Sequence, residues 1–358
     1  MEQIKELPAL RLISELIQDP ESKPFPRIIA EVLLLAARFG KFPRYYFARY
    51  LFRKDRNNIM DYYPTYYLDK IKPYFNDKEA RDVLENKLYF NFFYSQFGIS
   101  LPKILMYNHM NLFVVDNDCI EVHNIQDFKK LLVEAVRRST TGRSLFIKKT
   151  FWSYGGDQVY KITEDQIESD DKVISELYAN VIRSGFLYQE TVKQHPDLDR
   201  MNSSCLNTMR IDTFIGRDGK IRNMSAYLRT SIVNLHVDNI SSGGCRIAID
   251  LSTGKLADRA YQIFKANGVK LLTEHPVTGM AFRDFQIPFY TEAIEMVNRA
   301  AGLMPCLRLV GWDVAVGENG PVLIEGNSDY NMAGNDLAYG GYRSHPIFRE
   351  ALKEIGFL

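Results

Sequence analysis

Residues 308–327, which read RLVGWDVAVGENGPVLIEGN, constrain the fold of this chain more than any other stretch. Two apolar runs, Val310 to Val316 and Pro321 to Ile324, flank Glu318-Asn319-Gly320. A glycine at the end of this connection suits the positive φ angle of a three-residue hairpin loop. We therefore predict a β-hairpin centred on Asn319, with Asp313 opposite Glu325.

Three oxygen-bearing side chains would converge on one patch of this hairpin. Side chains alternate along a strand, so Glu325 and Asn327 share a face, and Asp313 lies opposite Glu325. Carboxylates are uncommon in apolar strands unless they are paired or bind a metal, and hard oxygen ligands of this kind suit Mg²⁺. The spacing therefore predicts a magnesium site at Asp313, Glu325 and Asn327. The alternative is a surface hairpin whose acids face water.

The composition restricts the class of protein. Of the 358 residues 46% are hydrophobic, and 45 Lys and Arg residues balance 44 Asp and Glu residues. This balance gives no general attraction to nucleic acid, so no nucleic-acid partner is expected. The four cysteines form no CxxC pair, no apolar run is long enough to span a bilayer, and the start MEQIKELPAL is unlike a signal peptide. These features predict a cytoplasmic enzyme or binding protein.

The order of elements indicates a mixed α+β architecture and not an alternating doubly wound sheet. Residues 1–95 are predicted to be mainly helical, residues 96–144 to form a small α/β unit and residues 145–358 to form the main domain. The predicted strands are 104–107, 112–116, 145–149, 159–162, 186–192, 207–215, 221–230 and 245–251. The predicted helices are 27–39, 127–138, 170–183, 288–301 and 346–355, with Gly40 and Gly185 as helix ends.

A basic and aromatic segment, KFPRYYFARYLFRKDR, occupies residues 41–56. As one helix it could lie on an anionic membrane or touch a lipid-linked sugar. The alternative is a helix that packs its Tyr and Phe side chains inward while its arginines extend to water. The pattern favours this packing alternative and leaves peripheral membrane contact through 41–56 as a second hypothesis.

Two pairs of basic residues are candidates for binding an anion. Lys148 and Lys149 end a strand before a glycine-containing loop, where lysine charge and backbone N–H groups suit phosphate, although a Gly-Gly hairpin is also common. Arg210 and Arg229 lie in apolar strands, where a guanidinium needs an anionic partner. With Asp218-Gly219 as the turn, these two guanidiniums could flank one anion. An ion pair with Asp212 or another acid explains them equally well.

Three further segments are less specific. Tyr188 to Val192 is an extended run whose backbone could meet an adenine edge, with Glu190 near a ribose. His195, which follows, is interpreted as a turn or helix-cap residue. Polar loops at residues 238–244 and 275–279 are candidates for binding substrate or phosphate. For each segment, an ordinary core strand or connection is the alternative.

Together, and in this order, these segments resemble an ATP-grasp domain. The resemblance is closer to the sugar-transfer-associated branch, and it covers about residues 95–335. The matching motifs are QHP at 194–196, NTMR at 207–210, LR at 228–229, DNxxxGG at 238–244, HPxTG at 275–279, VGWD at 310–313 and EGN at 325–327. The resemblance implies two α+β subdomains that hold ATP between them, after a mainly helical N-terminal region.

The resemblance also implies roles for individual residues, with ATP and Mg²⁺ as cofactors. Arg210 and Arg229 would be catalytic, and Asp313, Glu325 and Asn327 would bind Mg²⁺. Residues that would contact ATP are Lys148, Lys149, Gly155, Gly156, Gln189, Glu190, Thr191 and Val192. Residues that would contact substrate are Asp238, Asn239, Gly243, Gly244, His275 and Thr278. Many relatives have Lys-Pro at 148–149, so the identity of the lysine that faces ATP is left open.

The implied activity is that of an ATP-dependent ligase. A carboxylate would attack the γ-phosphate of Mg-ATP, and an amine or hydroxyl would then displace phosphate from the acyl phosphate. The branch suggests small-molecule substrates with a sugar among the acceptors, in cell-surface polysaccharide or sugar-conjugate biosynthesis. The alternatives are a kinase for a sugar or small molecule on the same scaffold and a non-catalytic nucleotide-binding partner protein.

Overall fold

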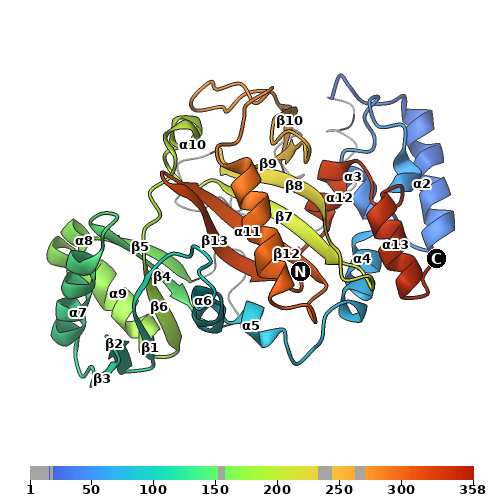
Figure 1. The fold of residues 1–358 in the computed structure, drawn as a ribbon. Coiled ribbons are helices and arrows are strands. Elements are labelled where there is room, and N and C mark those ends of the chain that lie inside the picture. Colours follow the sequence, from blue (N-terminus) through green and yellow to red (C-terminus); the bar gives the residue numbers. More distant parts are fainter. Residues whose placement is uncertain (1–15, 17–18, 152–157, 233–243, 263–270) are drawn as a thin grey trace.

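Two antiparallel sheets with helices packed on them form the body of the protein, and a mainly helical region precedes them (Figure 1). The structure is a computed structural model, and it describes residues 16, 19–151, 158–232, 244–262 and 271–358. The predicted α+β class and the helical N-terminal region are confirmed.

The smaller sheet combines strands from both sides of residue 144. Its order is β3-β2-β1-β6-β4-β5. Its strands are β1 (Ile104–His109), β2 (Leu112–Val115), β3 (Asp118–Glu121), β4 (Ser144–Lys149), β5 (Val159–Thr163) and β6 (Gly185–Glu190). Three helices, α7 (Ile125–Arg138), α8 (Glu164–Ser169) and α9 (Asp171–Val181), pack on one face, where Ile147, Tyr188 and Leu132 share an apolar core. The predicted boundary at residue 144 therefore falls inside one sheet.

The larger sheet has the order β11-β10-β9-β8-β7-β12-β13. Its strands are β7 (Thr208–Ile215), β8 (Ile221–Ser231), β9 (Gly244–Ile249), β10 (Leu256–Gln262), β11 (Leu271–Leu272), β12 (Leu309–Gly317) and β13 (Gly320–Asn327). Helix α11 (Tyr290–Gly302) packs across β7, β8, β12 and β13, and Trp312, Ile211 and Val297 lie in the core between them. Burial of these apolar side chains stabilises the sheet.

The β7–β8 register agrees with the prediction. Thr208 is the Cα partner of Arg229, and Arg210 is the partner of Tyr227. In the turn, Gly219 has a φ angle of 73°, which glycine adopts without strain. The Asp-Gly signal was therefore sufficient to place both arginines on neighbouring strands.

The β12–β13 hairpin differs from the prediction in its loop. Gly317 pairs with Gly320, so the loop contains two residues, Glu318 and Asn319, and the predicted three-residue loop is wrong. A register shift between Asp313 and Val314 adds one residue to β13, because Val314 pairs with Leu323. This bulge places Asp313 opposite Glu325, so the predicted pair is confirmed.

Three details of the smaller sheet and its helices also differ from the prediction. Gly185 does not end a helix but begins β6, where an added Cβ would lie 2.7 Å from Thr150 Oγ1. The glycine is needed because another part of the chain comes close to its backbone. The short helix α8, which a capping box at Thr163 starts, and strand β3 were not predicted.

The single helix predicted over residues 41–56 is wrong. Only α3 (Arg44–Ala48) is helical, and Tyr46 and Phe52 are buried in a core that includes Leu35 of helix α2 (Phe25–Phe39). Arg49 forms an ion pair with Asp336, and Arg53 Nη1 lies 3.4 Å from Asp19 Oδ2. The aromatic side chains pack inward, as the alternative proposed, but these two arginines are buried as ion pairs and do not extend to water.

Outside this segment, the described residues of the N-terminal region are mainly helical, as predicted. Its helices are α2 (Phe25–Phe39), α3, α4 (Thr65–Ile71), α5 (Asp82–Glu85) and α6 (Lys87–Ser95), with 3₁₀ turns at Ile59–Asp61 and Lys72–Tyr74. Gly40 ends α2 with a φ angle of 68°, which confirms the predicted helix end. In the described part of the chain, no helix is long and apolar enough to cross a bilayer.

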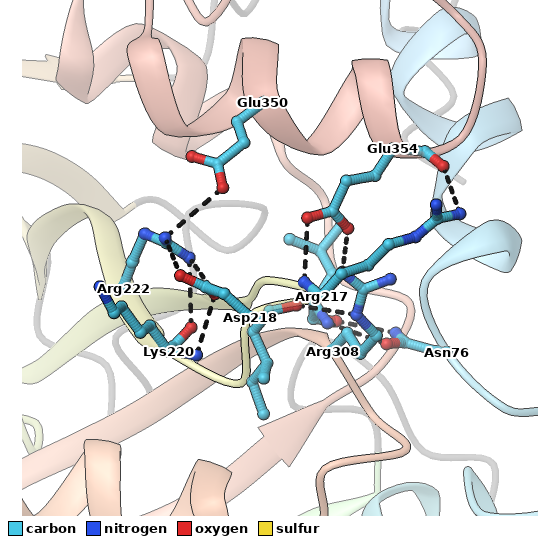
Figure 2. Close-up of polar contacts among 10 residues, drawn as sticks. Asn76, Arg217, Asp218, Lys220, Arg222, Arg308, Glu350 and Glu354 are labelled. Atoms are coloured by element: carbon cyan, nitrogen blue, oxygen red, sulfur yellow. Dashed lines mark hydrogen bonds and ion pairs between the residues drawn. The ribbon is translucent and has the colours of Figure 1, made fainter.

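The C-terminal helix α13 (Pro346–Glu354) is attached to the larger sheet by a polar cluster (Figure 2). The backbone N of Arg217 donates to Glu354 Oε1 at 2.9 Å, and its Nη2 donates to the Glu354 carbonyl at 2.7 Å. Arg308, just before β12, also donates to the Glu354 carboxylate, and Arg222 Nη2 lies 3.4 Å from Glu350 Oε1. These contacts join the β7–β8 turn, the start of β12 and α13.

Candidate functional site

The larger sheet has one apolar face and one face with charged residues at its centre. Ile211 and Trp312 point toward α11, so their neighbours Arg210 and Asp313 point to the opposite face. Arg210 and Asp313 are Cα partners on β7 and β12. The five residues Arg210, Arg229, Asp313, Glu325 and Asn327, which the sequence predicted as catalytic or metal-binding, come together on this face, and we call them the charged patch.

Asp313 is shared between two arginines. Arg210 donates to it from Nε and, at 3.0 Å, from Nη2, while Arg229 Nη2 lies 2.8 Å from Asp313 Oδ2. The exposed fractions of the side chains are 9% for Arg210, 16% for Arg229 and 1% for Asp313. The structure thus shows the alternative of an ion pair with another acid of the chain, and the binding of an external anion by the two guanidiniums stays a prediction.

Burial alone would raise the pKa of the Asp313 carboxyl. The charges of Arg210 and Arg229 and the contacts with Arg210 and Glu325 outweigh burial and hold this pKa below its ordinary value. For Arg210, burial acts to lower the pKa, but the charges of Asp313, Tyr227 and Glu325 and the hydrogen bond to Asp313 together outweigh burial and raise the pKa. The pair therefore stays ionised throughout the neutral range.

Asp212 takes no part in an ion pair with Arg210, and the sequence hypothesis of that pair is wrong. Its carboxylate accepts hydrogen bonds from Tyr330 Oη at 3.0 Å, from Tyr342 Oη and from Ser225 N at 2.8 Å. Burial raises the pKa of Asp212, although these hydrogen bonds oppose the change. Asp212 thus anchors Tyr330.

Tyr330 positions Arg210, and sequence reasoning missed it. The Arg210 guanidinium carbon lies 5.7 Å from the centroid of the Tyr330 ring. The ring covers Gly311 in the VGWD motif, where an added Cβ would lie 2.6 Å from Tyr330 Cγ. The glycine of this motif is therefore needed for the close approach of the tyrosine.

Glu325 and Asn327 form the more accessible part of the charged patch. Asn327 Nδ2 lies 3.3 Å from Glu325 Oε1, and the exposed fraction of the Glu325 side chain is 28%. Lys87 Nζ lies 3.6 Å from Glu325 Oε2, and the Lys87 backbone N donates to the carbonyl of Thr150, next to β4. Lys87 is thus a second residue that sequence reasoning missed, because it lies outside every motif.

The oxygen donors of the charged patch fit Mg²⁺. Two carboxylates and one amide oxygen on neighbouring strands are ligands that Mg²⁺ accepts, together with water or phosphate. Among the described residues, no three His, Cys, Asp or Glu side chains come together as a metal site. The predicted magnesium site therefore needs the amide oxygen of Asn327 as its third ligand. Glu325 is the more accessible carboxylate of this set, whereas both oxygens of Asp313 already contact arginines.

Arg246 of β9 is a third residue that sequence reasoning missed. It is the Cα partner of Arg229 on β8, so two arginines lie side by side on the sheet. Its guanidinium carbon lies 5.7 Å from the Tyr227 ring centroid. The signal in the sequence was the same as for Arg210, namely an arginine within an apolar strand.

In the smaller sheet, Lys148 and Lys149 point to opposite faces. Leu145 and Ile147 face α7–α9, so Lys149 shares their side and Lys148 points away with Phe146. The Lys148 Nζ lies 5.9 Å from the Phe146 ring centroid. Strands β4–β6 lie between these helices and β13, so the Lys148 side is the one that faces the larger sheet (Figure 1).

Residues 191–195, which we call the hinge, connect the two sheets. Strand β6 ends at Glu190, so Thr191 and Val192 lie beyond the strand that was predicted to include them. Lys193 O accepts a hydrogen bond from Glu318 N at 3.2 Å, and His195 N donates to Val316 O at 2.9 Å. Backbone hydrogen bonds therefore hold the hinge against the end of the β12–β13 hairpin.

The side chains around the hinge have structural partners. Gln189 Nε2 donates to Pro102 O at 3.2 Å, Glu190 Oε1 accepts from Thr140 N at 2.9 Å, and Thr191 Oγ1 contacts Ser144 Oγ at 2.8 Å. His195 Nδ1 accepts from Asp197 N at 3.2 Å and caps α10 (Pro196–Met201), as its interpretation as a cap residue predicted.

Several candidate residues lie outside the part of the chain that the structure describes. They are Gly155 and Gly156, which were predicted to contact ATP, and the predicted substrate residues Asp238, Asn239 and Gly243. Gly244 begins β9 and is buried. His275 Nε2 lies 2.8 Å from Ser231 O, and Thr278 Oγ1 donates to Met201 O at 3.0 Å. These two side chains bind backbone carbonyls, which favours the alternative of an ordinary connection at 275–279.

Comparison with known proteins gives a family match and distant structural likenesses. A family model described as sugar-transfer associated ATP-grasp matches residues 67–345. No curated protein matches the chain. D-alanyl-alanine synthetase A from Vibrio cholerae is 13% identical with a TM-score of 0.45, and the match covers 76% of this chain and 64% of that one.

Two other solved structures are similarly distant. D-alanine–D-alanine ligase from Bacillus anthracis is 14% identical with a TM-score of 0.37, covering 77% of this chain and 68% of that one. N5-carboxyaminoimidazole ribonucleotide synthetase from Thermotoga maritima is 10% identical with a TM-score of 0.37, covering 75% of this chain and 49% of that one. The chain thus spans 64% or less of the length of two of these three proteins.

Proposed function

Because the chain belongs to the sugar-transfer associated ATP-grasp family, we propose that it is an ATP-dependent ligase that activates a carboxylate as an acyl phosphate for attack by an amine or hydroxyl. One observation carries the proposal: two arginines and two carboxylates converge in the charged patch. Such a site suits a metal-bound triphosphate. The phosphate oxygens can bind the arginines, and the metal ion can bind the carboxylates.

Each residue of the charged patch has a proposed role. Bound Mg²⁺ would neutralise negative charge on the phosphates, and Glu325, Asn327 and Asp313 would hold it. Arg210 and Arg229 remain cationic and would stabilise the negative charge of the transferring phosphoryl group. Tyr330 would keep Arg210 in place for that contact. Lys148 would supply a point charge to the nucleotide from the smaller sheet.

The proposed reaction has two steps that balance in atoms and charge. A carboxylate oxygen bonds to the γ-phosphorus of ATP as the bond between that phosphorus and the bridging oxygen breaks, and ADP leaves. The amine or hydroxyl then bonds to the acyl carbon, the bond from that carbon to the phosphate oxygen breaks, and inorganic phosphate leaves. The attacking group releases its proton to solvent or to phosphate.

The substrates are proposed from the family and not from the site. The family description points to sugar transfer, so the acceptor is proposed to be a small sugar-bearing molecule in cell-surface polysaccharide or sugar-conjugate biosynthesis. A cytoplasmic location, where ATP is abundant, is part of this proposal. The four cysteines are free thiols, which suits a reducing compartment.

Trapping with hydroxylamine tests the proposed intermediate. The chain is incubated with Mg-ATP, hydroxylamine and a panel of amino acids and sugar acids, and ADP and hydroxamate are measured. An acyl phosphate yields a hydroxamate in amounts that match ADP. A stable phosphorylated product without hydroxamate would favour the kinase alternative. ATP binding without ADP release on any acid would favour the non-catalytic alternative.

A variant pair assigns the turnover to the charged patch. Glu325→Gln removes one charged oxygen ligand, so we expect ADP release to fall by about 100-fold. Glu292→Gln, on the exposed side of α11, removes the same charge away from the patch and should leave turnover unchanged. Full activity in Glu325→Gln would contradict the metal assignment.

A further inference from the structure

Helix α2 carries a concentrated set of exposed apolar side chains. The exposed fractions are 47% for Phe25, 44% for Ile29, 63% for Leu33 and 53% for Leu34, and Phe42 just after the helix is 58% exposed. Single exposed apolar residues are common on protein surfaces, but five within eighteen residues form a patch that indicates a binding surface. Helix α2 lies at the outer edge of the molecule (Figure 1).

Both sides of α2 are apolar. At about 100° per residue, Phe25, Ile29 and Leu33 follow one side of the helix, while Ile28 and Leu35 follow the other side and enter the core that contains Tyr46 and Phe47. This core therefore covers only part of the apolar surface of α2. Arg27, Glu31 and Arg38 form the polar stripe of α2, and the exposed apolar side needs an apolar environment other than this core.

Residues 22–44, which contain α2, carry a net positive charge. Between Ser22 and Arg44 the only acid is Glu31, which is 9% exposed. Its carboxylate binds Lys23 Nζ at 2.8 Å, Arg27 Nε at 2.9 Å and Tyr46 Oη at 2.6 Å. Exposed cations in this segment are Arg27, Arg38, Lys41 and Arg44. The patch thus offers cations but no exposed carboxylate.

Aromatic rings hold the cationic end of the patch. Lys41 Nζ lies 4.7 Å from the centroid of the Tyr66 ring, and Tyr66 Oη donates to Phe39 O at 3.0 Å. The Phe42 ring stacks on Phe47 with centroids 5.9 Å apart. Amphipathic rings beside cations are the composition found where a protein meets lipid headgroups.

We propose that α2 and residues 41–44 form a docking surface for an anionic lipid bilayer. With 15 residues and a length of about 22 Å, α2 would lie in the plane of the membrane and not cross it. Phe25, Ile29 and Leu33 would enter the acyl boundary, while Arg38 and Lys41 would meet headgroup phosphates. A second copy of the chain fits less well, because the exposed cations would face one another across the interface. The proposal does not depend on the ligase activity.

Vesicle sedimentation of the full chain tests the surface. Vesicles of phosphatidylcholine mixed with equimolar phosphatidylglycerol should bind the chain, and vesicles of phosphatidylcholine alone should bind it weakly. The Ile29→Glu, Leu33→Glu double variant should lower binding on the order of 100-fold, because two inserted side chains become charged. Leu112→Glu, on an exposed position of β2, is the matched control and should bind as the wild type does.

A charge variant and a position-specific probe complete the test. Arg38→Gln with Lys41→Gln should lower binding by about fivefold per charge, whereas Lys130→Gln with Arg137→Gln on α7 should have little effect. Lipids with brominated chains should quench the fluorescence of the tryptophan introduced by Leu33→Trp. They should not quench the fluorescence of the tryptophan introduced by Leu112→Trp. Three outcomes would overturn the proposal. The first is no vesicle binding by the wild type, and the second is equal quenching at both positions. The third is a dimer of the wild type that the Ile29→Glu, Leu33→Glu double variant dissociates.

Discussion

At the scale of single residues, Asp313 connects more of the candidate site than any other side chain described above. Its carboxylate is almost fully buried and receives both Arg210 and Arg229. Removing one member of a buried ion pair leaves the opposite charge without compensation, which costs more than the pair contributes to stability. Asp313 is therefore expected to maintain the structure of the patch as well as to serve as a proposed metal ligand.

Asp313→Asn separates these two roles. We expect the free energy of unfolding to fall by about 3 kcal/mol, because two guanidiniums lose their shared anion. Glu325→Gln is the matched control: it removes a proposed ligand that is partly exposed and should change stability by less than about 1 kcal/mol. Urea unfolding followed by circular dichroism measures both. Equal stability of the two variants would show that Asp313 does not anchor the arginines.

The sequence predicted which residues form the charged patch but not their ion pairs. The hairpin spacing placed Asp313 opposite Glu325, and the Asp-Gly turn placed Arg210 and Arg229 on neighbouring strands. The pairing of β12 with β7 brings together residues 103 positions apart, which no local pattern reveals. For the same reason the acid that meets Arg210 was not identified, and Asp212 was the wrong candidate.

At the scale of elements, α13 depends on a histidine cap. His345 Nδ1 accepts hydrogen bonds from Ile347 N at 3.2 Å and Phe348 N at 3.3 Å, and its Nε2 lies 2.8 Å from Met224 O. This arrangement requires a neutral ring with its proton on Nε2, because a protonated Nδ1 cannot accept. Burial lowers the pKa of His345, although the hydrogen bond to Met224 opposes the change.

The cap makes stability depend on pH. The pKa of His345 is lower in the folded chain than its ordinary value of about 6.5, so the unfolded chain binds more protons below that pH. This contribution to stability is complete above about pH 6.5 and is lost as pH falls toward the folded pKa. His345→Asn keeps an N-cap acceptor but does not titrate, so its unfolding temperature should fall less between about pH 7 and about pH 5.

Exposed His123 provides the control for this pH dependence. Its side chain is 67% exposed, so His123→Asn should preserve the wild-type change of unfolding temperature with pH. Thermal unfolding followed by circular dichroism at a series of pH values gives all three profiles. Identical profiles for the wild type and His345→Asn would mean that another group causes the loss of stability in acid.

Residues 41–56 show why some elements could not be predicted. The sequence has the basic and aromatic composition of a surface helix, but Tyr50 donates to the Gln262 carbonyl at 2.6 Å and Arg49 pairs with Asp336. These partners lie more than two hundred residues away, and they determine the conformation more strongly than local propensity does. By contrast, Gly40 ends α2 through a purely local conformation, and this end was predicted.

At the scale of the whole molecule, the two sheets are joined at a few defined places. The hinge is bound to the β12–β13 hairpin, and Leu323 N of β13 donates to Ser100 O at 2.8 Å, just before β1. Lys87 contacts both sheets, because its backbone N donates to the Thr150 carbonyl and its Nζ lies close to the Glu325 carboxylate. Lys148 on one sheet and the charged patch on the other can therefore act on one ligand only if it lies between the sheets.

Ligand-induced stabilisation tests this arrangement. The magnesium complex of a non-hydrolysable ATP analogue should raise the unfolding temperature of the chain, since a ligand at a hundred times its Kd adds about 2.7 kcal/mol. Lys148→Ala in the smaller sheet and Glu325→Gln in the larger sheet should each weaken the analogue by about tenfold and reduce the rise. Lys149→Ala is the matched control, because its side chain lies on the side of α7–α9. A larger loss in Lys149→Ala than in Lys148→Ala would place the nucleotide on the helical side of the smaller sheet, and the charged patch could not then contact its phosphates.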